Sequence, residues 1–273
     1  MKLWLLPVVL LSGLAAAAEL RNFQAVPHLS THGVESYKEF LTSGQHRAFA
    51  IAPGGTWAWR GDLPSREMAE RAVLADCRES TAQTCVPYAV DDQVVFDAKA
   101  WPKLWGPYAT ADAAKRAPIG VQRGERFPDL VFRDAAGQAT KVSDFRSQVL
   151  VLHFWGSWCG PCRRELPDLQ KLVRQMAKDR DIRFVFLPVR EPFKVARDWA
   201  LGQKLQLPLF DVGDKEFTLA SGERLPDRQV ASKFPTTYVL DKHGLVIFAH
   251  VGDASRWTEY AEFLKDAAVR SGR

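Results

Sequence analysis

The apolar run at Val149–Trp155 constrains the fold more than any other stretch of this 273-residue chain. A run that is apolar at nearly every position is typical of a strand buried on both faces of a sheet. A few residues later, positions 161–178 place Leu166, Leu169 and Leu172 on one stripe of a helix. A buried strand that passes directly into an amphipathic helix is typical of α/β folds.

The rest of residues 125–273 supplies more elements of this kind. We expect a hairpin-like entry over 130–145, a second buried strand over 182–189, a second helix over 193–205, a hairpin of strands at 237–240 and 245–250, and a closing helix over 257–269. This order predicts an α/β domain with a central sheet flanked by helices.

Residues 19–100 predict a separate, small α+β domain. Residues 19–36 lack a strong period. The pattern then indicates a strand at 48–52, a turn-rich piece with Trp57 and Trp59, a helix from Ser65 to Cys77, and strands at 88–90 and 94–96. Residues 101–124 are rich in proline and glycine and indicate a linker lying on a surface. For the group Trp57, Trp59, Trp101 and Trp105 we favour packing in a small core over a binding surface.

The first 18 residues predict a cleaved signal peptide. Lys2 supplies the positive start, Leu3–Leu14 the apolar stretch and Ala15–Ala18 the small-residue cleavage region. An uncleaved membrane anchor is the less favoured alternative, because the run is shorter than the roughly 20 residues of a spanning helix. We therefore expect a soluble periplasmic protein, in a compartment where disulfides persist.

Charge and composition exclude little beyond nucleic-acid binding. The net charge is +5, and lysine and arginine are spread along the chain, so no nucleic-acid partner is expected. The apolar content of 47% is ordinary for a globular protein. We expect no cofactor, no metal and a monomeric protein.

The cysteine pair of the stretch 158–162 lies where the buried strand ends and the helix begins. Unpaired backbone N–H groups and the positive end of the helix dipole favour the thiolate of Cys159 there. Cys162, one turn further on, can reach Cys159 and resolve a mixed disulfide. Pro161 suits the first helical turn, and Gly160 allows close approach of the backbone.

Three other interpretations of this pair are weaker. A zinc site lacks its other half, because the remaining cysteines Cys77 and Cys85 have the wrong spacing. A haem-attachment site requires histidine where the chain has Arg163. A purely structural disulfide would close too small a loop to stabilise much. Redox chemistry is therefore the favoured interpretation.

Residues 152–167 (LHFWGSWCGPCRRELP) and 233–244 (KFPTTYVLDKHG), with the lead-in Phe127–Leu130, resemble the thioredoxin superfamily. They are most similar to its extracytoplasmic TlpA/ResA-type branch, which includes thioredoxins of cytochrome c maturation. The resemblance covers residues 125–273 and implies a thioredoxin-like fold with thiol–disulfide oxidoreductase activity. Residues 48–96 are only weakly similar to small cysteine-containing modules of bacterial envelope proteins, and this similarity implies no activity.

The resemblance also implies residue roles. Pro235 matches the family's cis-proline, and the backbone on either side, at Phe234 and Thr236, pairs with an extended client peptide in that family. Trp158, Gly160 and Pro161 complete the expected client-binding surface.

Two further residues leave alternatives open. Glu165 is either a buried carboxyl that exchanges a proton with Cys162 or an exposed first-turn residue stabilised by the helix dipole. His153 departs from the family, which has Asp or Asn at this strand position. It is either a proton relay or, the favoured interpretation, a satisfied core histidine.

Cys77 and Cys85 are expected to form a structural disulfide in the first domain. The alternative is a second redox pair that passes electrons to Cys162, but these cysteines do not lie at a helix start.

These inferences together predict a protein-disulfide reductase of the bacterial cell envelope. Its expected partners are disulfide-containing client proteins and a membrane thiol reductase that supplies electrons. The alternatives are a dithiol oxidase and a chaperone-like protein that binds clients through the first domain, with the redox pair secondary.

Overall fold

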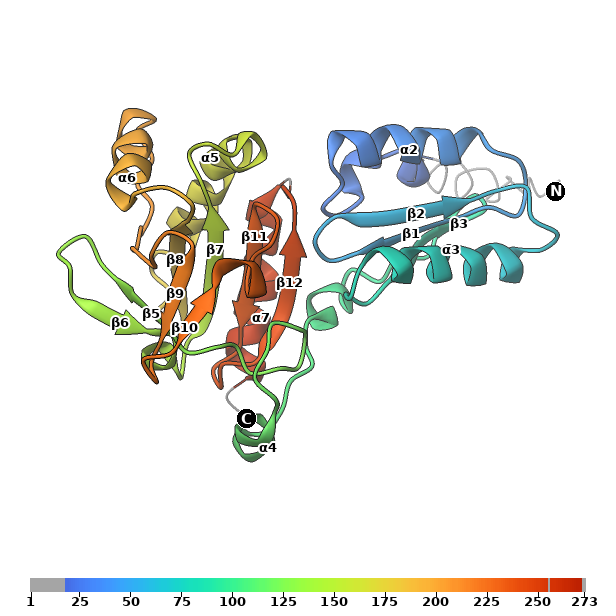
Figure 1. Ribbon diagram of the computed structural model, residues 1–273. Coiled ribbons are helices and arrows are strands. Elements are labelled where there is room, and N and C mark those ends of the chain that lie inside the picture. The colour runs from blue at the N-terminus through green and yellow to red at the C-terminus, as the bar shows by residue number, and fades with distance from the viewer. Residues whose placement is uncertain (1–17, 255, 272–273) are drawn as a thin grey trace, which may run out of the picture. The chain divides into compact units, whose positions relative to one another are not determined.

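A computed structural model describes residues 18–254 and 256–271 (Figure 1). The chain divides into two compact units, with the division between Trp101 and Pro102. The expected signal peptide lies, except for Ala18, outside the described residues. Within those residues, no helix combines the length and the apolar character that a bilayer span requires.

The first unit is a four-stranded antiparallel sheet with a helix on each face (Figure 1). The strand order is β2-β1-β3-β4. Its elements are η1 (Phe23–Ala25), α2 (Thr31–Thr42), β1 (Ala48–Ala52), β2 (Thr56–Arg60), α3 (Arg66–Ser80), β3 (Val86–Val90) and β4 (Gln93–Val94).

Strand β1 is buried on both faces because successive side chains alternate between the two helices. Its alanines pack against Ala69 and Val73 of α3. On the opposite face, the ring of Phe49 lies 4.9 Å from that of Tyr37 and 5.7 Å from that of Phe40, both on α2. The small domain thus has a core of its own.

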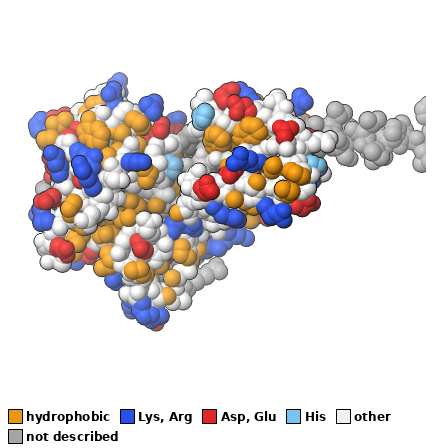
Figure 2. All heavy atoms as spheres, turned by 45° about the vertical axis from the view of Figure 1, so that its right-hand side comes forward, with side chains coloured by type: hydrophobic (Ala, Val, Ile, Leu, Met, Phe, Trp, Pro, Cys, Tyr) orange, Lys and Arg blue, Asp and Glu red, His pale blue; other side chains and the backbone are white. Residues whose placement is uncertain are grey.

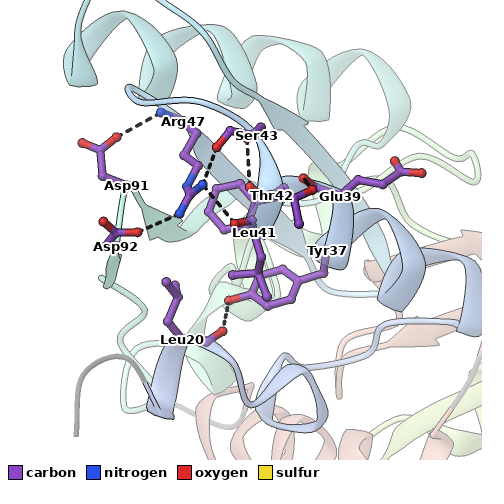
Figure 3. Close-up of polar contacts among 10 residues, drawn as sticks. Leu20, Tyr37, Glu39, Leu41, Thr42, Ser43, Arg47, Asp91 and Asp92 are labelled. Carbon is purple, nitrogen blue, oxygen red and sulfur yellow. Dashed lines mark hydrogen bonds and ion pairs between the residues drawn. The ribbon is translucent and has the colours of Figure 1, made fainter. Parts of the chain in front are cut away.

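Polar contacts fix the connection between α2 and β1 (Figure 3). The Arg47 guanidinium donates to the carbonyls of Leu41 (3.0 Å) and Ser43, and pairs with Asp92 at 2.7 Å. The Tyr37 hydroxyl donates to the Leu20 carbonyl at 2.8 Å. Burial raises the pKa of Tyr37, so its hydroxyl remains a donor at neutral pH.

The structure confirms part of the expected first domain and corrects the rest. The strand at 48–52 is confirmed, and the helix opened by Ser65 extends to Ser80. The turn-rich interpretation of Trp57 and Trp59 is wrong, because both lie on β2, paired with β1. Helix α2 was not expected, because its apolar residues are interrupted by charged residues and a glycine.

The second unit contains two four-stranded sheets. Its elements, with η2 (Trp101–Leu104) at the division, are α4 (Ala111–Arg116), β5 (Leu130–Arg133), β6 (Ala139–Lys141), η3 (Val142–Phe145), β7 (Val149–Trp155), α5 (Gly160–Gln175), β8 (Ile182–Pro188), α6 (Phe193–Gly202), β9 (Glu216–Leu219), β10 (Arg224–Pro226), η4 (Asp227–Gln229), β11 (Thr236–Leu240), β12 (Val246–Val251), η5 (Trp257–Tyr260) and α7 (Ala261–Arg270).

The main sheet has the order β12-β11-β7-β8, in which β7 and β8 are parallel and the other pairs antiparallel. Strand β7 is buried along its whole length, as its sequence predicts. Leu150, Leu152 and Phe154 belong to a core shared with the second sheet, β10-β9-β5-β6. Because side chains alternate along a strand, His153 points to the other face, where it contacts Trp257 of η5.

The residues after Trp101 pack on the second unit. Trp105 is buried, and its ring stacks on Phe248 at 4.7 Å and Phe263 at 5.1 Å. Trp101 belongs to the first unit, where its ring lies 5.4 Å from that of Phe96. Trp105 is therefore a core residue of the second unit, whereas Trp57, Trp59 and Trp101 belong to the first unit.

The hairpin of β9 and β10 was not expected from the sequence. Its strands are short and largely exposed, so they lack the apolar run or alternation that marks a buried strand. Phe217 is the exception and is fully buried. This hairpin leads into η4, which carries Asp227 towards the site described next.

Candidate active site

Cys159 and Cys162 lie at the junction of β7 and α5, where the sequence predicts them. Cys159 is the N-cap residue of α5, and its Sγ accepts the backbone N–H of Cys162 at 3.2 Å. The two sulfurs form a disulfide, with the Cα atoms 5.3 Å apart. Cys159 is 5% exposed and Cys162 is fully buried, so an incoming sulfur reaches Cys159 first.

The start of α5 favours a thiolate at Cys159 once the disulfide is reduced. The backbone N–H of Cys162 points at its sulfur, and the helix dipole adds positive potential there. Gly160 and Pro161 form the first helical turn, and the proline at that position sacrifices no intrahelical hydrogen bond.

The loop before Cys159 is fastened to the end of β8. The Trp158 indole Nε1 donates to the Val189 carbonyl at 3.0 Å, while the side chain remains 48% exposed. The buried carboxylate of Glu191 accepts the Ser157 backbone N–H at 2.6 Å and also the Ser157 hydroxyl. The sequence interpretation did not identify Glu191 or Ser157, because 34 residues separate them.

Pro235 lies at the start of β11, after a cis peptide bond with Phe234. The Phe234 ring meets the Trp158 ring edge to face, with the centroids 5.4 Å apart. The Thr236 hydroxyl donates to the Lys233 carbonyl at 2.6 Å. The Trp158–Phe234 contact therefore joins the two expected client-binding segments, although 76 positions of sequence separate them.

Glu165 is buried, which removes the alternative of an exposed first-turn residue. Its Oε2 accepts the Ala254 backbone N–H and the Trp257 indole N–H, both at 3.0 Å. Burial raises the pKa of Glu165 to about 8, against these two hydrogen bonds, which lower it. Since Glu165 follows Cys162 by three residues on α5, the two side chains are neighbours on the helix surface.

His153 is also buried, and it faces Glu165. Its Nε2 lies 3.4 Å from Glu165 Oε1, and its Nδ1 lies 2.9 Å from the Thr237 hydroxyl. Desolvation, with the nearby His250, lowers the pKa of His153 to about 3. Across β11, Thr237 is paired with both His153 and His250, so the three residues form a row on the sheet.

The His153–Glu165 pair has one proton to share. Neither Nε2 nor Oε1 has another hydrogen-bond partner among the described residues. Two bare lone pairs would repel, so one of the two atoms must carry the proton that lies between them. The raised pKa of Glu165 and lowered pKa of His153 favour the neutral arrangement of carboxylic acid and imidazole.

The second cysteine pair lies in the first unit. Cys77 and Cys85 form a disulfide, and both are buried in the core between α3 and the sheet. Cys77 lies near the C-terminal end of α3, where the helix dipole disfavours a thiolate. Over the described ranges, no three His, Cys, Asp or Glu residues are grouped so as to hold a metal ion.

Comparisons with known proteins agree with this geometry. Residues 122–264 match the Redoxin family model, and the chain belongs to this family. It is 30% identical to the thioredoxin-like protein YneN of Bacillus subtilis over 56% of this chain and 83% of that protein. It is 30% identical to the thiol-disulfide oxidoreductase ResA of Geobacillus kaustophilus over 46% of this chain and 67% of that protein.

Among solved structures, StoA from Bacillus subtilis is 22% identical, with a TM-score of 0.40, over 51% of this chain and 98% of that one. Within the thioredoxin superfamily, the chain is of the ResA/TlpA type, which confirms the resemblance seen in residues 125–273. It is a thiol–disulfide oxidoreductase that acts on disulfide-containing substrates.

Proposed function

We propose that this protein reduces protein disulfides outside the cytosol, with Cys159 as the nucleophile and Cys162 as the resolving residue. The observation that carries the proposal is the position of Cys159 at the N-cap of α5, where its sulfur accepts the Cys162 N–H. The Cys159 thiolate attacks a client disulfide, forming a mixed disulfide and releasing one client sulfur as a thiolate. The Cys162 thiolate then attacks Cys159, which closes the enzyme disulfide and releases the second client sulfur.

The client lies as an extended strand beside Pro235 in this proposal. Proline has no N–H, so Pro235 offers no donor that competes for the thiolate. Backbone groups at Phe234, just before β11, pair with the client chain as an added strand would, and Thr236 at the start of β11 holds this segment in place. Trp158, Gly160 and Pro161 form the opposite wall. The half-exposed Trp158 indole supports this placement, because exposed aromatic rings are common at protein interfaces.

Glu165 exchanges the proton of Cys162. Cys162 must lose its proton before it attacks the mixed disulfide, and it regains one when a donor protein opens the enzyme disulfide. A carboxyl with a raised pKa, one helical turn from Cys162, can take and return this proton near neutral pH.

His153 relays the proton of Glu165 in the same scheme. His153 Nε2 takes the proton of the Glu165 carboxyl and returns it, so that a transient imidazolium–carboxylate pair forms while Nδ1 keeps its proton and donates it to the Thr237 hydroxyl oxygen. The contact of 3.4 Å and the bond of 2.9 Å support this role.

The direction and the location complete the proposal. The Gly160-Pro161 dipeptide is that of reducing thioredoxins, which favours reduction. The signal-peptide pattern of residues 1–18 favours the periplasm, and the ResA/TlpA relationship favours a role in cytochrome c maturation. A monomeric reductase there requires electrons from a membrane thiol reductase, because the periplasm is kept oxidising.

The reduction potential of the Cys159–Cys162 couple tests the direction. Equilibration with glutathione should give a value near −270 mV, as for a reducing thioredoxin. A value near −120 mV, that of a strong oxidant, would instead establish the dithiol oxidase alternative.

The first unit suggests a recruiting role, because it has a core and a disulfide of its own. Deletion of residues 19–101 tests this role; the cut precedes Trp105, which belongs to the core of the second unit. A recruiting role predicts normal reduction of small disulfides and loss of native clients. Unchanged capture of native clients would exclude it.

A further inference from the structure

Arg190 lies at the rim of the candidate active site. Its backbone has a left-handed conformation that residues other than glycine rarely adopt. It lies two residues after the end of β8, and its φ is 58°. Its backbone N–H donates to the Asp214 carbonyl at 3.0 Å, which holds the chain in this left-handed turn. A strained residue beside a reacting pair raises the question of what its side chain does there.

Two contacts aim the Arg190 side chain. Its Nε donates to the Asp227 carboxylate at 2.5 Å, and Asp227 is buried on η4. Its Cζ lies 4.7 Å from the centroid of the Phe234 ring. The guanidinium therefore lies against the ring of Phe234, the residue before Pro235, beside which the client strand is proposed to lie.

The hydrogen-bonding capacity of Arg190 is only partly used. A guanidinium has five N–H donors, and the contact with Asp227 uses the one on Nε. Among the described residues, the buried Nη2 finds no acceptor. The Arg190 side chain is nevertheless 27% exposed, so a bound client can reach the guanidinium, and an acceptor that it supplies to the unused donors would be favourable.

The surrounding charges indicate the kind of acceptor. Asp227 already neutralises Arg190, and the adjacent Glu191 carries a further buried carboxylate bonded to Ser157. This group of three has two negative charges and one positive charge. A client carboxylate would be repelled there, whereas a neutral main-chain carbonyl would be accepted.

We propose that the Arg190 guanidinium donates a hydrogen bond to a main-chain carbonyl of an extended client beside Phe234, and that it thereby favours polypeptide disulfides over small disulfides. This inference rests on the proposed function. It makes Arg190 a specificity-determining residue, because the bond is made to the client chain and not to the reacting sulfurs.

Steady-state reduction of two substrates tests the proposal. One is a disulfide-bridged peptide, and the other is hydroxyethyl disulfide, which has no peptide carbonyl. Arg190→Met should raise the KM for the peptide about tenfold or more with kcat unchanged, the effect of one lost hydrogen bond to a charged donor. Hydroxyethyl disulfide should be reduced at the normal rate. The peptide KM of Arg190→Lys should lie between those of Arg190→Met and the wild type, because lysine keeps the positive charge but lacks the planar, multiple N–H donors of the guanidinium.

Arg163→Met is the matched control. Arg163 is exposed, and its Cζ lies 5.8 Å from the Trp199 ring, so this variant removes the same charge and a similar ring contact near α5. It should leave both substrates unaffected. An equal loss with both substrates in Arg190→Met would overturn the proposal in favour of a structural role, as would an unchanged peptide KM.

Two disulfide-bridged peptides, one with Glu and one with Gln beside the cysteine, test whether Arg190 donates to a main-chain carbonyl or to a client carboxylate. A neutral carbonyl predicts that Arg190→Met weakens both peptides equally. A larger loss with the Glu peptide would overturn the carbonyl assignment. Failure of the wild-type protein to reduce either disulfide would instead refute the proposed reductase function, so the two failures are distinguishable.

Discussion

The two disulfides of this protein lie at opposite ends of helices. Cys159 caps the N-terminus of α5, whereas Cys77 lies near the C-terminus of α3. Both bridges are largely buried, and both are closed in the structure. The difference is electrostatic: the first helix end stabilises a thiolate and the second destabilises it. If Cys159 and Cys162 are the reacting pair, as proposed, the position on a helix therefore distinguishes the two pairs better than burial does.

The largest expected difference between the two pairs is in activity. Cys159→Ser should reduce turnover of a disulfide-bridged protein to the uncatalysed rate, because serine supplies no sulfur to form the mixed disulfide. Cys77→Ser should retain most of the activity if the first unit still folds. The measurement is the rate of insulin disulfide reduction with excess donor thiol. Comparable activity in both variants would remove the functional distinction between the bridges.

Stability should show the reverse order. Replacement of both Cys77 and Cys85 by alanine should destabilise the first unit by roughly 2.6 kcal/mol, the loop-entropy value for a bridge of this span. The Cys159–Cys162 bridge closes a much shorter loop, so Cys159→Ala with Cys162→Ala should cost the second unit less. Denaturant unfolding, with differential scanning calorimetry as a second measurement, gives the loss of stability in each of the two double variants. A larger loss for the Cys159 pair would contradict the structural assignment of Cys77 and Cys85.

The surroundings of the pairs differ in titrating groups as well. The pKa of Glu165 is raised from 4.5 in the unfolded chain to about 8 in the folded protein. Between these two values the folded state binds one proton more than the unfolded state, so the free energy of unfolding falls as the pH rises from 4.5 to about 8. The pKa of His153 is lowered from 6.5 to about 3, so its contribution grows with pH up to 6.5. The two opposing slopes cancel between pH 4.5 and 6.5.

Stability should therefore fall between pH 6.5 and 8, by about 1.4 kcal/mol per pH unit for one proton, or roughly 2 kcal/mol over this range. Glu165→Gln should abolish the fall, because the amide does not titrate. Thermal unfolding of both proteins over this pH range provides the measurement. An identical fall in the variant would show that another group causes it, and Glu165 would then lose its support as a proton carrier.

How much of this site the sequence could predict depended on sequence distance. The strand Val149–Trp155, the cysteine pair and the helix were predictable because they are contiguous and their patterns are local. The contacts of Glu165 were not, because its partners Ala254 and Trp257 lie 89 and 92 residues away. The same holds for Arg190 and Asp227, which meet through a hairpin that has no strong strand pattern.

His153 and Glu165 show most clearly what a single sequence cannot predict about the site. Each was identified separately as a candidate, but their contact depends on which face of β7 meets α5. That face follows from packing between elements, which a single sequence does not specify.

The smallest expected effect is the shift in the Cys159 pKa itself. In a Cys162→Ser variant, Cys159 keeps the backbone N–H at residue 162 and the helix dipole but has no disulfide partner. Its thiol should titrate about one unit or more below the free value of ~8.5. Iodoacetamide alkylation across a pH series, followed by mass spectrometry of the Cys159 peptide, measures this midpoint. The buried Cys77–Cys85 bridge stays unreactive and serves as the internal control. A midpoint at or above 8.5 would mean that the helix N-terminus gives Cys159 no electrostatic advantage, and the contrast between the two pairs would have to be sought in access alone.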